Sequence, residues 1–166
     1  NADSKLKFPQ QFSDEKRMVY LDGEAYFEVA KNRELPFIIK TKDAQVRVLG
    51  TKFNVQAWEM DHRVSVSVKE GKVSVEKKDT TKNTSRVILE KNQQVVLEDG
   101  LDDISVENLK DQRFMYWLNG GLYFHNTPFP NVIKRLERQF NVSIKIKDDE
   151  LAAYRYSGAF QKADLE

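Results

Sequence analysis

The chain has 166 residues, of which 27 are lysine or arginine and 26 are aspartate or glutamate, so its formal net charge is only +1. This balance argues against a nucleic-acid-binding protein, which normally carries a surplus of basic side chains on one face. The absence of cysteine excludes disulfides, thiolate metal sites and a cysteine nucleophile. With 40% hydrophobic residues the chain can bury a core, and its length suits one medium domain or two small ones.

From about residue 16 to residue 106, apolar and polar side chains alternate with a period of two, which predicts β-strands. Val64, Val66 and Val68 are typical of the inward positions, and the serines between them belong to the opposite face. This part of the chain is therefore predicted to be a β domain. The expected strands are residues 17–21, 24–30, 37–41, 45–49, 52–58, 63–68, 72–77, 86–90 and 94–97.

Turn signals separate these strands, among them Asp22-Gly23 and Asp99-Gly100, and the wholly polar segment 77–85 predicts a loop. At Gly50 the apolar positions change from even to odd numbers, which predicts a bulge or a tight corner. Glycines that precede short strands fit either the coils of a β-roll or short solenoid, or the hairpin turns of an antiparallel sandwich. The sequence leaves these alternatives open.

Beyond residue 100 the pattern changes to that of a small α/β subdomain. Leu122 and Phe124 alternate as in a strand, and the segment 126–128, Asn-Thr-Pro, predicts the start of a helix that ends at Asn141. Residues 142–146 and 154–160 predict two further strands. A helix with one apolar face must lie on a sheet, so we expect a β-α-β-β order. The apolar stripe consists of Phe129, Val132, Ile133, Leu136 and Phe140, with Lys134, Arg135, Glu137 and Arg138 outside it.

Few residues suggest chemistry. His62 and His125 are far apart in sequence and lack the spacing of a metal site. Asp22, Glu24 and Glu28 could form a carboxylate pair, but alternation places Glu24 and Glu28 on a solvated strand face. Phosphate loops and a serine elbow are absent from the sequence. We therefore predict no enzyme, no cofactor and no metal.

Aromatic residues leave one alternative open. Trp58, Tyr116 and Trp117 could line a platform for sugar rings, although large aromatic side chains more often pack in cores. A carbohydrate- or ligand-binding β domain of the cell envelope would present a groove around Trp58.

Three segments, 21–30 (LDGEAYFEVA), 36–41 (PFIIKT) and 48–55 (VLGTKFNV), closely resemble the FecR domain. The segments 1–9 (NADSKLKFP) and 70–75 (EGKVSV) resemble further blocks of this family. The tail, with Trp117, 121–128 (GLYFHNTP), 136–138 (LER), 140–142 (FNV) and 154–160 (YRYSGAF), is similar to the small domain that follows FecR in anti-sigma regulators and is related to the secretin and TonB N-terminal short domain. Residues 1–106 are thus assigned to a FecR-like β domain and residues 107–166 to the subdomain.

The resemblance implies a single-pass inner-membrane protein of Gram-negative bacteria. Its periplasmic sensor would relay a signal from an outer-membrane TonB-dependent transporter to a cytoplasmic ECF sigma factor. The membrane helix and the sigma-binding segment are not in this sequence, and we expect both ends to be trimmed, the subdomain being incomplete.

The same resemblance implies that the transporter's signalling domain docks on the C-terminal subdomain. Strand addition at a sheet edge is one plausible mode, because backbone hydrogen bonds give affinity and alternate side chains select the partner. The side chains expected to be exposed there and to contact this partner are Tyr123, Arg135, Arg138, Tyr154 and Arg155.

Overall fold

The computed structural model describes residues 1–78, 85–98, 104 and 106–162. The chain forms two compact units, one spanning Ser4–Gln112 and the other Arg113–Glu166 together with Asn1–Asp3. The predicted domain ranges, 1–106 and 107–166, stay predictions. In the described part of the chain, no helix has the length and apolar character needed to cross a membrane.

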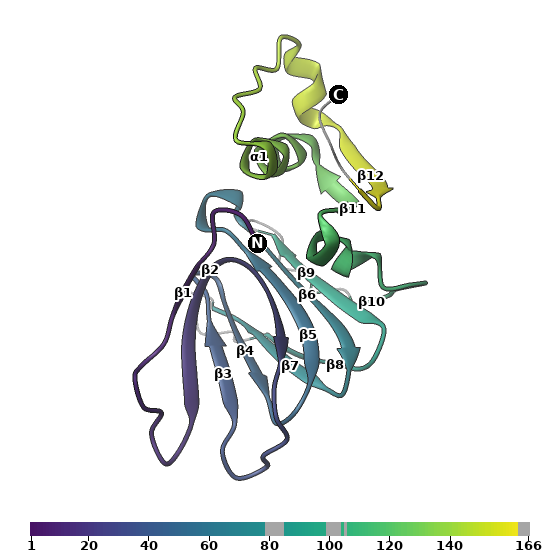
Figure 1. Ribbon diagram of the computed structural model, residues 1–166. Coiled ribbons are helices and arrows are strands. Elements are labelled where there is room, and N and C mark those ends of the chain that lie inside the picture. The colour runs from purple at the N-terminus through teal and green to yellow at the C-terminus, as the bar shows by residue number, and fades with distance from the viewer. Residues whose placement is uncertain (79–84, 99–103, 105, 163–166) are drawn as a thin grey trace. The chain divides into compact units, whose positions relative to one another are not determined.

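The first unit is one curved sheet that nearly closes into a barrel (Figure 1). Among the described residues, nine strands follow one another in the order β10-β9-β6-β5-β2-β3-β4-β7-β8, and β1 pairs with β2 as a tenth. The strands are β1 (Lys5–Lys7), β2 (Arg17–Glu28), β3 (Phe37–Lys40), β4 (Ala44–Val48), β5 (Lys52–Ala57), β6 (Arg63–Glu70), β7 (Val73–Lys77), β8 (Arg86–Leu89), β9 (Gln93–Glu98) and β10 (Val106–Asn108).

The prediction of a mainly β unit is confirmed, but the solenoid is wrong and the sheet is barrel-like. A solenoid stacks successive coils in parallel, whereas here the strand pairs of the described part are antiparallel except for β2 with β3. In addition, the consecutive strands β4 and β5 are not neighbours in the sheet. The strand β4 pairs with β3 and β7, whereas β5 pairs with β2 and β6. The sheet therefore bends around a single interior instead of forming repeated coils.

Gly50 forms the tight corner between β4 and β5 that the parity change predicts. Its φ of 152° is a backbone conformation that residues with side chains rarely adopt. A Cβ atom at this position would lie 2.5 Å from the Cα atom of Lys31. Only glycine therefore fits where the chain crosses from one part of the sheet to another.

Asp22-Gly23 is not a turn, which corrects another prediction. The two segments predicted as separate strands form the single long strand β2. Its residues 17–20 pair in parallel with β3, and its residues 23–28 pair antiparallel with β5. The Asp-Gly dipeptide thus marks the point where β2 changes its pairing partner from β3 to β5. In the sequence, such a point has the same residue pattern as a turn.

Valine and other branched side chains fill the barrel interior, as alternation predicts. Val64, Val66 and Val68 of β6 are buried there. Ser65 and Ser67 on the other face of β6 are buried too, so both faces of this strand are covered. The largest fully buried apolar side chains of the unit are Phe53, Ile39, Leu89, Val46, Val55, Val66, Val68, Val73, Val75 and Val95.

The second unit has the order β11, α1, β12 (Leu122–Pro128, Phe129–Phe140 and Arg155–Phe160), so the predicted β-α-β-β order is wrong by one strand. Residues 142–146 pair with no strand of the described part. Their backbone bonds to the helix instead, because the Val142 and Ile144 N–H groups donate to the main-chain oxygen and the carboxylate of Glu137. Short 3-10 helices complete the described chain at Glu59–Asp61, Arg113–Asn119 and Asp149–Ala153.

The helix α1 ends at Asn141 as predicted, in a left-handed conformation with a φ of 51°. Its predicted start is wrong, because the segment 126–128 belongs to β11 and no side chain caps the helix. Pro130 instead occupies the first turn, where its missing N–H group costs no hydrogen bond. The predicted turn at Asp99-Gly100 and most of the predicted loop 77–85 lie outside the described residues.

Candidate partner-binding surface

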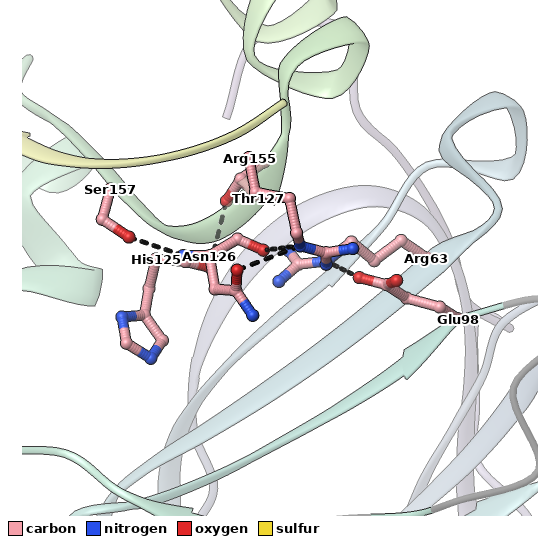
Figure 2. A network of polar contacts seen from close by, with 7 residues as sticks. All are labelled: Arg63, Glu98, His125, Asn126, Thr127, Arg155 and Ser157. Carbon is pink, nitrogen blue, oxygen red and sulfur yellow. Dashed lines mark hydrogen bonds and ion pairs between the residues drawn. The ribbon is translucent and has the colours of Figure 1, made fainter. Parts of the chain in front are cut away.

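Two strands, β11 and β12, form the ribbon on which the predicted binding residues lie. Their register shifts between Phe124 and Thr127, and Asn126 at this bulge has a φ of 44°. Arg155 of β12 spans the bulge, since its Nε donates to both the main-chain oxygen and Oδ1 of Asn126 at 3.0 Å (Figure 2). The Asn126 N–H donates in turn to Ser157 Oγ at 2.9 Å. The bulge thus fixes the position of the Arg155 guanidinium.

The strand β12 is the exposed member of this ribbon. Within the described residues it pairs with β11 alone, so its other edge is open. Tyr154, directly before β12, is 61% exposed, and Tyr156 and Phe160 are exposed as well. The Tyr156 ring also contacts Phe124 edge-on, with the ring centroids 5.8 Å apart. This surface combines an unpaired backbone edge with aromatic side chains.

Tyr123 is half-buried. Its ring stacks on that of His125 at 6.4 Å between centroids, and the guanidinium of Arg113 lies 5.5 Å from the Tyr123 ring centroid. Tyr123 therefore presents only part of its side chain to a partner.

Arg135 is buried, which contradicts its prediction as an exposed residue of the helix. It is only 7% exposed, its guanidinium lies 5.5 Å from the centre of the Phe124 ring, and Nη1 donates to the Tyr123 main-chain oxygen. A long arginine stem can cover apolar surface in this way, so the apolar stripe alone does not define the buried face. In this unit Arg135 joins the helix to β11.

Arg138, one turn later, has a mostly buried side chain, and its Nε lies 4.0 Å from Asp3 Oδ2. Of the five predicted residues, Tyr154 and Arg155 are thus the exposed ones and lie next to each other at the start of β12. The binding role of all five stays a prediction.

Glu24, in the first unit, is the residue that sequence reasoning placed wrongly. It is 0% exposed instead of solvated. Its Oε1 accepts hydrogen bonds from Asn54 Nδ2 at 2.8 Å and Gln56 Nε2 at 2.6 Å, both from the neighbouring strand β5. The polar residues Asn54 and Gln56, at alternate positions of a strand opposite Glu24, are the signal that could have revealed this network.

The predicted carboxylate alternative finds no support, because the three acids have different partners. Asp22 Oδ1 accepts the N–H of Glu59, and Glu28 Oε1 accepts the hydroxyl of Tyr26. The same unit also contains an ion pair between Arg63 Nε and Glu98 Oε1 at 3.0 Å, which joins β6 to β9 (Figure 2). In these contacts the carboxylates accept hydrogen bonds or form ion pairs that stabilise the β domain.

The described residues support neither a metal site nor a sugar-binding platform at Trp58. No group of three or more possible metal ligands occurs among the residues that the structure describes. His62 follows the 3-10 helix Glu59–Asp61 in a left-handed conformation with a φ of 49°. Trp58 is only 7% exposed, so it offers no platform on which a sugar ring could stack.

Comparisons with known proteins relate both units to one family. The family model described as "FecR protein" matches residues 1–74, and the model described as "FecR, C-terminal" matches residues 121–166. None of the curated proteins matches the chain.

Two solved structures are similar along nearly the whole chain. They are crystal structures, at 1.65 Å and 2.50 Å resolution, of a candidate anti-sigma factor from Parabacteroides distasonis ATCC 8503. Each has 35% sequence identity to this chain and matches 99% of it. The match covers 76% and 75% of those chains, with TM-scores of 0.87 and 0.86.

Proposed function

Because this chain belongs to the FecR family of anti-sigma factors, we propose that it is the periplasmic sensor portion of a transmembrane anti-sigma regulator. In this role it receives a contact from the signalling domain of an outer-membrane TonB-dependent transporter and relays it to an ECF sigma factor. The sigma factor would be bound by a cytoplasmic segment outside this sequence. The family is one of regulators and not of enzymes, which agrees with a role in protein contact.

The observation that carries this proposal is that β12, in the region that matches the C-terminal FecR model, pairs along only one edge within the described residues. An edge strand offers unpaired main-chain N–H and C=O groups to an incoming strand. Tyr154 and Phe160 flank this edge and are exposed. Aromatic side chains with both apolar area and, for tyrosine, a hydroxyl group are the residues most often found to dominate binding energy at interfaces.

Arg155 has a second role in the proposal, which is to hold the edge in shape. Its hydrogen bonds to Asn126 fix the bulge of β11 and so the twist of the two-stranded ribbon. Arg135 and Arg138 support the helix behind the ribbon through Phe124 and Asp3.

A calorimetric titration with the signalling domain of the cognate transporter tests the proposal. We expect the 166-residue chain to bind it, and Tyr154→Ala to weaken binding by about tenfold, the effect typical of an interface aromatic residue. Tyr20→Ala is the matched control, because Tyr20 is a similarly exposed tyrosine, at 52% against 61% for Tyr154, and lies on β2 in the other unit. The proposal fails if the wild-type chain does not bind or if the two variants lose affinity equally.

A further inference from the structure

The first unit contains a pocket of about 290 Å³ that the proposed function does not use. It lies where the ends of β4 and β7, the edge strand β8 and the Gly50 corner come together. Its volume is at the lower limit of small-molecule pockets, which is enough for one or two side chains of a binding partner. The lining residues are Lys31, Arg33, Arg47, Val48, Leu49, Gly50, Thr51, Lys72, Val73, Ser74, Arg86 and Ile88.

Five of these residues carry a positive charge, and no acidic residue lines the pocket in the described part of the chain. This concentration contrasts with the formal net charge of +1 for the whole chain. Lys72 is the cation that an acid from outside the lining neutralises, because its Nζ lies 2.6 Å from Glu90 Oε1. The hydrogen bond and the charge of Lys72 lower the pKa of Glu90, which stays ionised. Glu76 lies directly across from Arg86 in the sheet and offsets part of its charge, so the positive potential of the pocket is strongest around Lys31, Arg33 and Arg47.

The cations sit on a fixed framework. Arg86 Nε donates to Ser74 Oγ at 2.8 Å, and Ser74 lies directly across from Arg47 in the sheet. On the opposite rim, the N–H of Asn32 donates to the Leu49 main-chain oxygen at 2.7 Å, which holds the segment containing Lys31 and Arg33 against the corner. The backbone at each cation is thus held by the sheet or the corner, and the Arg86 guanidinium is also held by Ser74, which lowers the entropy that this side chain loses when an anion binds.

Apolar side chains lie between the charges. Ile88 of β8 is 60% exposed, and Leu49 is exposed as well. Ile88 lies directly across from Ser74, in the same row as Arg47. Val48 and Val73 add apolar surface to the lining. The occupant must therefore carry both negative charge and apolar groups at short spacing.

From these contacts we propose that the pocket binds an extended acidic segment of a partner protein, which places carboxylates on Arg47 and Arg86 and an apolar side chain on Ile88. Charge complementarity selects the acidic partner, because planar guanidinium groups match carboxylates in two-point hydrogen bonds. An extended peptide suits the site because, among the residues that the structure describes, β8 is the last strand in the order of the sheet, and alternate residues of a strand alongside it would face the pocket. No aromatic ring lines the pocket in the described part of the chain, which disfavours a sugar.

This inference concerns the unit Ser4–Gln112 and does not rest on the proposed function. The test is a fluorescence anisotropy titration of the chain with a labelled hexapeptide Glu-Ser-Val-Ser-Glu-Ser, whose glutamates and valine lie on one face when the peptide is extended. We expect saturable binding that the double variant Arg47→Glu/Arg86→Glu weakens by about tenfold or more, since charge pairs in an interface reverse from attraction to repulsion. Arg47→Gln/Arg86→Gln removes the charges without repulsion and should have an intermediate effect.

The matched control is Lys5→Glu/Lys7→Glu, which changes the net charge equally at exposed positions of β1, outside the pocket. We expect this control to change affinity by less than about twofold, because exposed charges at a distance are screened. Equal losses in the two glutamate variants would overturn the site. So would equal binding of the same hexapeptide with glutamine in place of both glutamates, displacement of the acidic hexapeptide by an equal charge concentration of inorganic phosphate, or tighter binding of phosphatidylglycerol vesicles through the same two arginines.

Discussion

At the scale of single residues, the buried carboxylate of Glu24 is the clearest case of a polar side chain that stabilises the sheet. The amide groups of Asn54 and Gln56 both donate to it, so its removal leaves two donors without their acceptor. Glu24→Ala should lower the free energy of unfolding by about 1–3 kcal/mol in a urea titration, the cost of buried polar groups left unsatisfied. Glu24→Gln keeps one acceptor oxygen and should lose less.

Glu28→Ala is the control for this prediction, because Glu28 lies on the same face of β2 but is exposed. Its loss should stay within about 0.5 kcal/mol, as is usual for surface substitutions. If Glu24→Ala costs no more than Glu28→Ala, the network does not stabilise the barrel.

Tyr26 gives the first unit a specific response to alkaline pH. Burial raises the pKa of its phenol from 10.0 to about 12, with help from the charge of Glu28, from its hydrogen bond to that residue and from the charge of Glu70. The unfolded chain therefore releases this proton at lower pH than the folded chain does. The contribution of Tyr26 is complete below about pH 10 and is lost as the pH rises towards 12.

Urea titrations of the wild-type chain and of Tyr26→Phe, at about pH 9 and about pH 11.5, measure this contribution. The free energy of unfolding should fall more steeply for the wild-type chain, because the variant has no phenol at this position to ionise. If the free energy of unfolding falls by the same amount in both proteins between these two pH values, the pKa of Tyr26 is the same in the folded and the unfolded chain.

At this scale the sequence predicts the inward valines well and the charged residues poorly. Val64, Val66 and Val68 lie inside because alternation places all three on one face of the strand, and that apolar face packs against the core. Glu24 and Arg135 share faces with solvated residues in the sequence pattern, yet both are buried. Their burial depends on hydrogen-bond partners from other strands, which alternation within one segment does not reveal.

At the scale of secondary-structure elements, the corner between β4 and β5 tests whether close approach or backbone angle requires a glycine. Gly50→Ala should lower the free energy of unfolding by about 1–3 kcal/mol, because the new Cβ would meet the backbone of Lys31 at 2.5 Å in addition to the strain of a positive φ.

Gly120→Ala is the matched variant, because Gly120 also has a positive φ but a Cβ there would have no atom within 4 Å. Thermal unfolding should show the larger loss for Gly50→Ala. Equal losses would mean that the backbone angle alone accounts for the glycine.

The elements also show where local patterns stop being informative. Most strands of the barrel and the helix α1 appear near their predicted positions, because each has a clear periodicity. Residues 142–146 alternate like a strand, but their N–H groups bond to Glu137 of the preceding helix. The dipeptide at residues 22–23 changes the partner of β2 without a chain reversal. Both errors arise because pairing partners, and not periodicity, decide whether a segment is a strand or a turn.

At the scale of the whole molecule, the order of the strands could not be predicted from the sequence. This order is what distinguishes a barrel-like sheet from a solenoid or a sandwich. The parallel pairing of β2 with β3 joins segments that no hairpin connects. Family membership was predictable, because the FecR segments and the C-terminal segments are each specific and occur in order. The two matching family models confirm that resemblance.

The central claim is that this chain acts by protein contact through the ribbon edge at β12. Amide hydrogen exchange of the chain, with and without a saturating amount of the cognate transporter's signalling domain, tests it most directly. We predict slower exchange at residues 154–160 in the complex, while amides in the middle of β5 and β6 keep their rates. A complex that forms and leaves exchange at residues 154–160 unchanged would contradict the claim.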